Sequence, residues 1–91
     1  SKYGLTSSVK NSIIAQGCVI EGEVENCVLS KGVYVGEGAK ISNCIVMQDT
    51  KIGCNTNLNY VIIDKDVTIK DGRSLMGFDS YPIYIAKKSV V

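Results

Sequence analysis

Hydrophobic and polar positions alternate along this chain in short groups that recur about every six residues. In each group a small or β-branched residue and a large aliphatic residue flank one residue of any kind. Side chains two positions apart on a β-strand share one face, so both members of a pair should point inward and the middle residue should face water. The pairs are Ser12/Ile14, Cys18/Ile20, Cys27/Leu29, Val33/Val35, Ala39/Ile41, Cys44/Val46, Thr50/Ile52, Thr56/Leu58, Val61/Ile63 and Val67/Ile69.

Glycine, asparagine and aspartate stand between these pairs, and these residues accept the left-handed backbone conformation of a turn. The chain should therefore turn a corner after each short strand, and three strands with three corners make one coil. Similar segments begin at Asn26, Asn43 and Tyr60, 17 residues apart, and a less regular copy begins at Asn11. Self-similarity at a short fixed period indicates a solenoid. We predict an all-β fold, a single-stranded parallel β-helix of hexapeptide repeats with about 17 residues per coil.

The repeat is irregular at both ends. Only four residues separate Ile20 from Val24, so we expect a tight or distorted first coil with Val24 at a corner. We predict a lead-in segment at 1–8, the β-helix at 9–72, and a C-terminal strand and cap at 73–91. In this last segment 81–85 should form a strand, and three apolar side chains should cover the open end of the column, a position that otherwise invites strand addition. These are Leu75, Met76 and Phe78.

Composition fits one small domain without a strong charge. The 91 residues are 45% hydrophobic with a net charge of +1, so charge suggests neither nucleic acid nor an anionic membrane as partner. No apolar run has the length of a membrane span.

The four cysteines fall into two kinds. Cys18, Cys27 and Cys44 occupy the small inward position, where a thiol is a compact apolar filler, whereas Cys54 follows a turn glycine and should be exposed. Cys27 and Cys44 lie one coil apart, so they either pack as thiols or form a disulfide. Packing thiols favour a reducing, cytoplasmic compartment.

The chain contains no histidine. This excludes a histidine general base and a three-histidine zinc site, and no phosphate-binding loop occurs either. The carboxylates stand in turns among Lys and Gly rather than in a desolvated pocket. We therefore expect no catalytic, cofactor-binding or metal-binding residue. Four basic residues towards the C-terminus are candidates for contact with an anionic effector, with solvated surface charge as the alternative. They are Lys70, Arg73, Lys87 and Lys88.

The run NSIIAQGCVIEGEVENCVLSKGVYVGEGAKISNCIVMQDTKIG resembles the C-terminal left-handed β-helix of bacterial ADP-glucose pyrophosphorylase, also called glucose-1-phosphate adenylyltransferase. The ending VIIDKDVTIKDGRSLMGFDSYPIYIAKKSVV is similar to the GlgD-type rather than the catalytic GlgC-type subunit of glycogen biosynthesis. The resemblance covers nearly the whole chain. It implies a left-handed coil and a role in making ADP-glucose from ATP and glucose-1-phosphate.

The same resemblance implies that ATP, Mg²⁺ and the sugar phosphate are bound by an N-terminal catalytic domain outside these residues. The chain would then be an oligomerisation and regulatory domain. Its partners would be its own N-terminal domain and either identical subunits or a catalytic subunit. The alternative is the β-helix of another sugar-nucleotide transferase or of a hexapeptide acyltransferase whose catalytic groups lie elsewhere.

Overall fold

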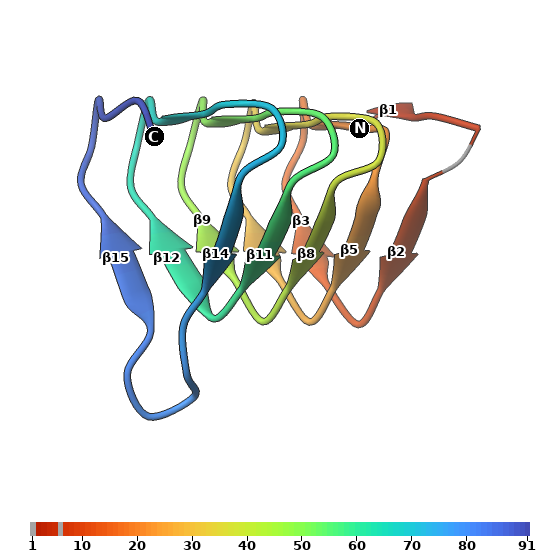
Figure 1. Cartoon of the computed structure of the whole chain (residues 1–91). Helices are drawn as coiled ribbons and strands as arrows, with labels where there is room; N and C mark the ends of the chain where they lie inside the picture. Colours follow the sequence, from red (N-terminus) through yellow and green to blue (C-terminus); the bar gives the residue numbers. More distant parts are fainter. Residues whose placement is uncertain (1, 6) are drawn as a thin grey trace.

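A computed structural model describes residues 2–5 and 7–91. The described residues contain fifteen short β-strands and no helix, arranged as three parallel sheets of five strands (Figure 1). None of them forms a helix that is long and apolar enough to cross a membrane. The column measures 32 × 23 × 23 Å. The predicted fold class, an all-β parallel β-helix, is confirmed.

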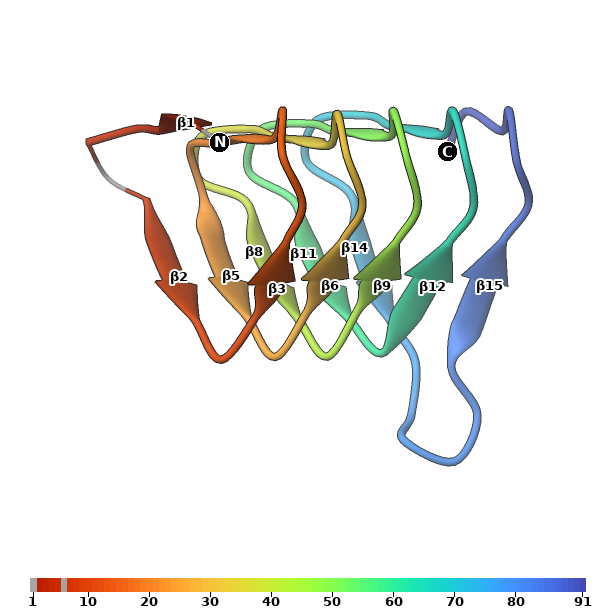
Figure 2. The same ribbon diagram turned by 180° about the vertical axis from the view of Figure 1, so that it is seen from behind.

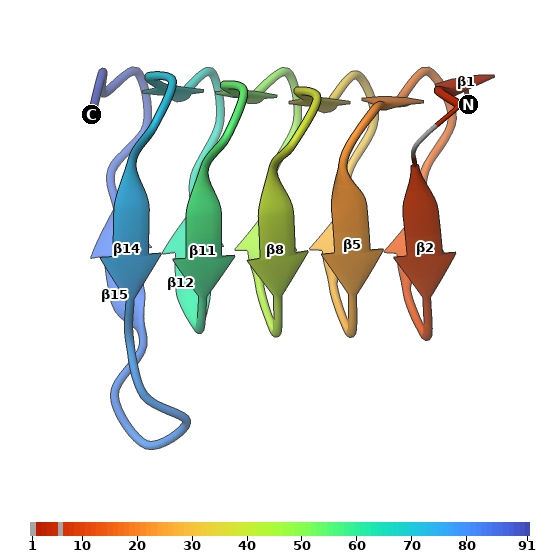
Figure 3. The ribbon, with the colours of Figure 1, turned by 45° about the vertical axis from the view of Figure 1, so that its right-hand side comes forward.

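Consecutive strands belong to different sheets, so each coil contributes one strand to every sheet. Sheet A contains β1 (Lys2–Tyr3), β4 (Val19–Ile20), β7 (Tyr34–Val35), β10 (Lys51–Ile52) and β13 (Thr68–Ile69). Sheet B, which faces the viewer in Figure 3, contains β2 (Ser8–Lys10), β5 (Glu23–Glu25), β8 (Lys40–Ser42), β11 (Asn57–Asn59) and β14 (Ser74–Met76). Sheet C contains β3 (Ile13–Ile14), β6 (Val28–Leu29), β9 (Ile45–Val46), β12 (Val61–Ile63) and β15 (Ile83–Ile85).

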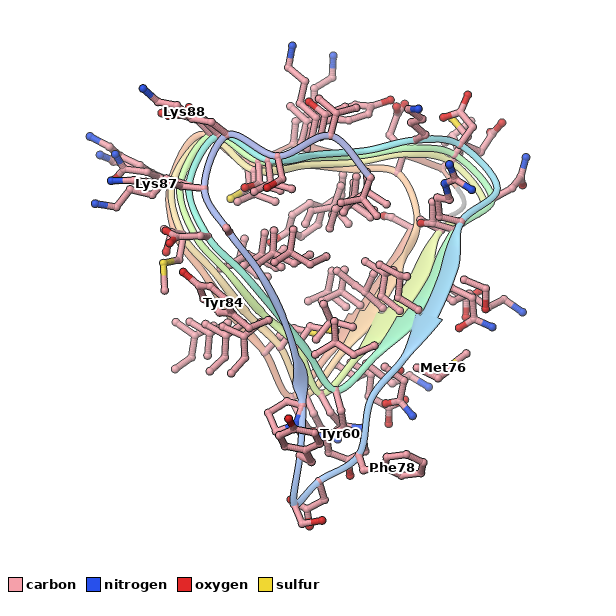
Figure 4. All side chains as sticks on the ribbon, turned by 60° about the vertical axis from the view of Figure 1, so that its left-hand side comes forward. Tyr60, Met76, Phe78, Tyr84, Lys87 and Lys88 are labelled. Atoms are coloured by element: carbon pink, nitrogen blue, oxygen red, sulfur yellow. The ribbon has the colours of Figure 1, made fainter. Side chains whose placement is uncertain are left out.

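The hand of the coil is visible along its axis. Figure 4 brings the C-terminal end forward, and the chain there passes from Met76 to Phe78, then to Tyr84 and Lys87, in a clockwise sense. Clockwise rotation towards the viewer is a left-handed coil. This is the hand implied by the family resemblance, and it differs from the right-handed crossovers that parallel strands normally make.

The core is a column of stacked aliphatic side chains inside the triangle. Nine of the ten predicted pairs are buried, from Cys18/Ile20 to Val67/Ile69. The first pair, Ser12/Ile14, is half-buried because its coil lies near the open N-terminal end. Two of the fully buried residues are polar, and both are satisfied: Thr50 Oγ1 donates to the Asp64 carbonyl oxygen at 2.8 Å, and Thr56 Oγ1 to the Gly53 carbonyl oxygen at 3.2 Å.

The corners carry the left-handed residues that the turn chemistry predicted. One corner stacks Asn11, Asn26, Asn43 and Tyr60, with φ between 49° and 55°. A second stacks Gly17, Gly32, Asp49, Asp66 and Lys88, and the third stacks Gly38, Asn55 and Gly72. Most of these residues are Gly, Asn or Asp, which tolerate positive φ, and Tyr60 and Lys88 are the exceptions.

The irregular coil is confirmed, but its cause differs from the prediction. Val24 is no corner residue: it is the buried centre of β5 and pairs with Ile41. The corner between β4 and β5 is shorter than the same corner in the next coil, so Val19 pairs with Tyr34, only 15 residues further on. Gly22 makes this short corner possible, because a Cβ there would lie 2.5 Å from the Ala39 carbonyl oxygen.

The sheets extend beyond the predicted limits of 9–72. Strands β1 and β2 already pair with β4 and β5, so most of the predicted lead-in belongs to the first coil. At the other end β14 and β15 continue sheets B and C. The predicted C-terminal strand is therefore β15, a regular member of sheet C.

A projecting hairpin separates β14 from β15. Val61 pairs with Ile83, 22 residues further on, so the last coil holds five residues more than the regular 17. Figure 1 shows the extra residues as a loop that extends below the column. Phe78 and Tyr81 bridge it and are 72% and 81% exposed. The prediction that Met76 and Phe78 cover the open end is wrong, because the hairpin carries Phe78 away from the axis. Of the three predicted capping residues, only Leu75 packs against the core.

Candidate interaction surface

The outer faces of the three sheets differ in chemistry. On sheet B the outward rows are polar except at Met76, with Glu23, Lys40 and Asn57 in one register. Sheet A presents a mixed row that includes Val19, Tyr34, Lys51 and Thr68. Sheet C presents aliphatic and aromatic residues on every strand. We call this row the apolar ladder: Ile13, Val28, Ile45, Ile62 and Tyr84.

The apolar ladder is continuous because each rung stands beside the next in the strand register. Figure 2 shows the five strands that carry it side by side at the front of the molecule. Ile13 is 70% exposed, Ile45 44% and Tyr84 59%. In Figure 4, Tyr84 points outward from this face, beside a row of carbon-only side chains. A contiguous exposed apolar face of this kind marks an interaction site.

Hydrogen bonds to Asp64 orient the last side chain of the ladder, Tyr84. The Tyr84 hydroxyl donates a hydrogen bond to Oδ2 of Asp64, and the backbone N–H of Lys65 donates to Oδ1 of the same carboxylate at 2.7 Å. The Tyr84 hydrogen bond is the main reason that the pKa of Asp64 is lowered, and it raises the pKa of Tyr84. The aromatic ring is thereby fixed over sheet C.

The sequence predicted the first four ladder positions as outward-facing, gave no direction for Tyr84, and did not identify the ladder as a site. The available signal was the middle residue of the first, third, sixth and ninth inward pairs; the first interval is shorter because no pair was assigned to β5. Those residues are Ile13, Val28, Ile45 and Ile62, all aliphatic, whereas the middle residues of the pairs on sheet B, such as Lys40 and Asn57, are polar. Sorting the middle residues by sheet, which needs the coil period, separates the faces.

The four basic effector candidates do not form one cluster. Lys70 and Arg73 lie between β13 and β14, at the corner that joins sheets A and B. Lys87 and Lys88 follow β15 at the corner that joins sheets C and A, where the N–H of Lys88 donates to the Lys65 carbonyl oxygen at 3.0 Å. Strand β13 separates the two pairs, so one small anion would meet one pair only.

A second polar pair lies on sheet A. The Tyr34 hydroxyl donates to Oε1 of Glu21 at 2.7 Å, and this bond raises the pKa of Tyr34 to about 12. The pair links neighbouring coils across the short corner. Open hollows lie beside both residues, one lined in part by Tyr34 and Lys70 and the other by Glu21 and Glu37. We assign the pair a structural role, because its hydrogen bond joins neighbouring coils.

The cysteines are all free thiols. Cys18, Cys27 and Cys44 are buried as predicted, and Cys54 is partly exposed. Cys27 and Cys44 directly precede the neighbouring strands β6 and β9, and their thiols donate to the backbone carbonyl oxygens of Glu25 and Ser42. The interaction between the two side chains is the main cause that lowers the pKa of Cys27 and raises that of Cys44. Among the described residues no three His, Cys, Asp or Glu side chains gather as metal ligands.

Several known proteins are similar in sequence to this chain. Residues 1–81 match a family model described as GlmU-like, C-terminal hexapeptide. The chain belongs to this family. It is also 51% identical over 87 residues, 96% of its length, to the glycogen biosynthesis protein GlgD of Bacillus subtilis. These matches confirm the resemblance found in the sequence.

Two further relatives carry an enzyme name. The chain is 53% identical over 66 residues to a glucose-1-phosphate adenylyltransferase of Acetivibrio thermocellus, and 35% identical over 94 residues to that of Clostridium perfringens. These alignments cover 72% and 97% of the chain. The chain spans about a quarter or less of each relative: 25% of GlgD, 16% and 24% of the two transferases.

Proposed function

We propose that this chain is the β-helix domain of an ADP-glucose pyrophosphorylase subunit of the GlgD type, and that it joins and regulates subunits in the cytoplasm during glycogen biosynthesis. The observation that carries the proposal is the 51% identity to GlgD over 96% of the chain. The apolar ladder adds a physical reason, because covering an exposed apolar face with a partner removes it from water and lowers the free energy.

The chemistry of the parent reaction would lie outside this chain. That reaction converts ATP and glucose-1-phosphate into ADP-glucose and pyrophosphate. The nucleotide, the sugar phosphate and Mg²⁺ would be held by the larger part of the subunit, since the chain spans only a quarter of GlgD. The β-helix would act through its contacts with that part and with other subunits.

The acyltransferase alternative has less support. The relatives described above are named for glycogen biosynthesis and for adenylyl transfer to glucose-1-phosphate. An acyltransferase β-helix would bind acetyl-CoA between its coils. Titration calorimetry of the chain with acetyl-CoA distinguishes the two hypotheses, because we expect no heat of binding and a measurable affinity would contradict our proposal.

An anionic effector of the assembled enzyme would contact one basic corner rather than both. We propose the Lys87 and Lys88 corner, because Lys65 lies beside it and adds a third cation. In the complete enzyme, Lys87→Gln with Lys88→Gln should weaken the response to the effector, whereas Lys70→Gln with Arg73→Gln should leave it unchanged. The reverse result would move the contact to the other corner.

The regulatory role is tested by activity. The chain is added to the glucose-1-phosphate adenylyltransferase subunit encoded in the same genome, and the initial rate of ADP-glucose synthesis is measured. We expect the two proteins to co-elute and the rate or its substrate dependence to change. Separate elution with an unchanged rate would contradict the proposal.

A further inference from the structure

We propose that the apolar ladder on sheet C pairs two copies of this chain face to face. The inference rests on the proposed assembly function and names both the face and its partner. Four properties of sheet C carry it: its continuity, its lack of opposing charge, its regular spacing and its area.

The charges on sheet C permit this face to contact the same face of a second copy. The ladder carries no ionisable group except the Tyr84 hydroxyl, and the next outward row on sheet C holds one charged residue. That row is Ala15, Ser30, Met47, Asp64 and Ala86. The Asp64 carboxylate already accepts two hydrogen bonds from its own coil and the next. The ladder and this row therefore bring no cations together, and the nearest ones, Lys31, Lys65 and Lys87, stand at the corner beside them. On sheets A and B, in contrast, lysines stand in the outward rows themselves.

Spacing permits contact along the whole face. The five strands of sheet C are neighbours about 4.8 Å apart, and the packing distance between two stacked sheets is about 10 Å. Because both copies have the same strand spacing, their rungs can interdigitate from one end of the column to the other. A face that contacts itself forms a two-fold, isologous interface. Ile45 is the middle rung, so it faces Ile45 of the second copy whether the two columns run parallel or antiparallel.

Area sets the strength of the contact. Two copies that pair through the ladder and the row beside it would bury on the order of 1,000 Å² of accessible surface in total. This area is at the lower end for a specific interface. The pair should therefore be reversible, with a Kd in the micromolar range rather than that of an obligate dimer. Interfaces elsewhere in the assembled subunit would add to this contact.

Disulfide trapping tests the geometry. In a Cys54→Ser background, which removes the one partly exposed thiol, Ile45→Cys should form a covalent dimer under mild oxidation. Lys51→Cys, exposed near the centre of sheet A, is the matched control and should remain monomeric. Circular dichroism and thermal melting of each variant verify that the coil is intact. Equal trapping of the two variants, or no trapping of a folded Ile45→Cys variant, would overturn the proposal.

The same method reports the orientation of the pair. Ile13→Cys mixed with Tyr84→Cys should give mixed dimers if the columns run antiparallel, and each variant should dimerise with itself if they run parallel. Protection of the ladder only within the complete subunit would identify another domain as its partner and would also overturn the proposal. The rate assay with the catalytic subunit is independent, so it can succeed while trapping fails.

Discussion

At the scale of single residues, the coil depends on a few backbone positions that accept positive φ. Asn26 lies at one of them, with φ of 53°. A residue with a Cβ but no local hydrogen-bonding side chain is less stable there, and glycine carries no such penalty. We expect Asn26→Ala to lower the free energy of unfolding by about 1 kcal/mol and Asn26→Gly to be nearly neutral. Urea denaturation measures both, and equal losses would mean that the conformation of this corner is not the cause.

Two glycines are required for different reasons. A Cβ on Gly36 would lie 2.8 Å from the backbone nitrogen of Cys54, so Gly36→Ala must displace the next coil. A Cβ on Gly72 would contact nothing within 4 Å, and only its φ of 75° opposes the substitution. We expect a loss of about 2–3 kcal/mol for Gly36→Ala and about 1 kcal/mol for Gly72→Ala. Thermal unfolding gives the comparison, and the reverse order would contradict the stacking described here.

Asp64 and Tyr84 predict a dependence on pH. The hydrogen bond from Tyr84 holds the pKa of Asp64 below its ordinary value. A carboxylate with a lowered pKa in the folded state contributes stability above the unfolded pKa of about 4, and this contribution is lost as the pH falls through the folded value. Tyr84→Phe should raise the pKa of Asp64 and reduce this acid-side loss. Carboxyl NMR titration measures the shift, and an unchanged pKa would remove Tyr84 as its cause.

At the scale of the strand, one face is structural and the other is exposed. Ile52 is fully buried, whereas its neighbour Lys51 faces solvent on the same strand, β10. We expect Ile52→Asp to prevent folding, because it places an unpaired charge among stacked aliphatic side chains, and Lys51→Asp to change stability by less than about 0.5 kcal/mol. Circular dichroism and denaturation test the pair. Similar effects at both positions would mean that the strand register is wrong.

Alternation and turn residues were sufficient to predict the strands because each depends on neighbours within a few positions. Cys44 and Val46 were assigned inward from their spacing alone, and both are buried. The ends of the column were harder to predict. The hairpin that carries Phe78 follows no repeat, and Val24 was misplaced because a shortened corner can lose its residues before or after the strand. The ladder was missed because Ile45 and Val28 become neighbours only after coiling.

At the scale of the whole molecule, the fold separates stability from recognition. The interior column of aliphatic residues holds the coils together, and the three outer faces are free to differ. Two faces are polar or mixed, and sheet C is apolar along its length. Recognition is therefore assigned to a sheet rather than to a pocket, which agrees with the proposed role in joining subunits.

Sedimentation equilibrium of the chain tests the central claim, that sheet C is the joining face. Three proteins are compared: the original chain, Ile45→Lys on sheet C, and Val19→Lys on sheet A, where the same kind of substitution is made outside the ladder. We expect reversible dimers for the original chain and for Val19→Lys, and at least about tenfold weaker association for Ile45→Lys, because two ammonium groups would meet at the two-fold axis. A monomer at every concentration, or association that Ile45→Lys leaves unchanged, would contradict the account.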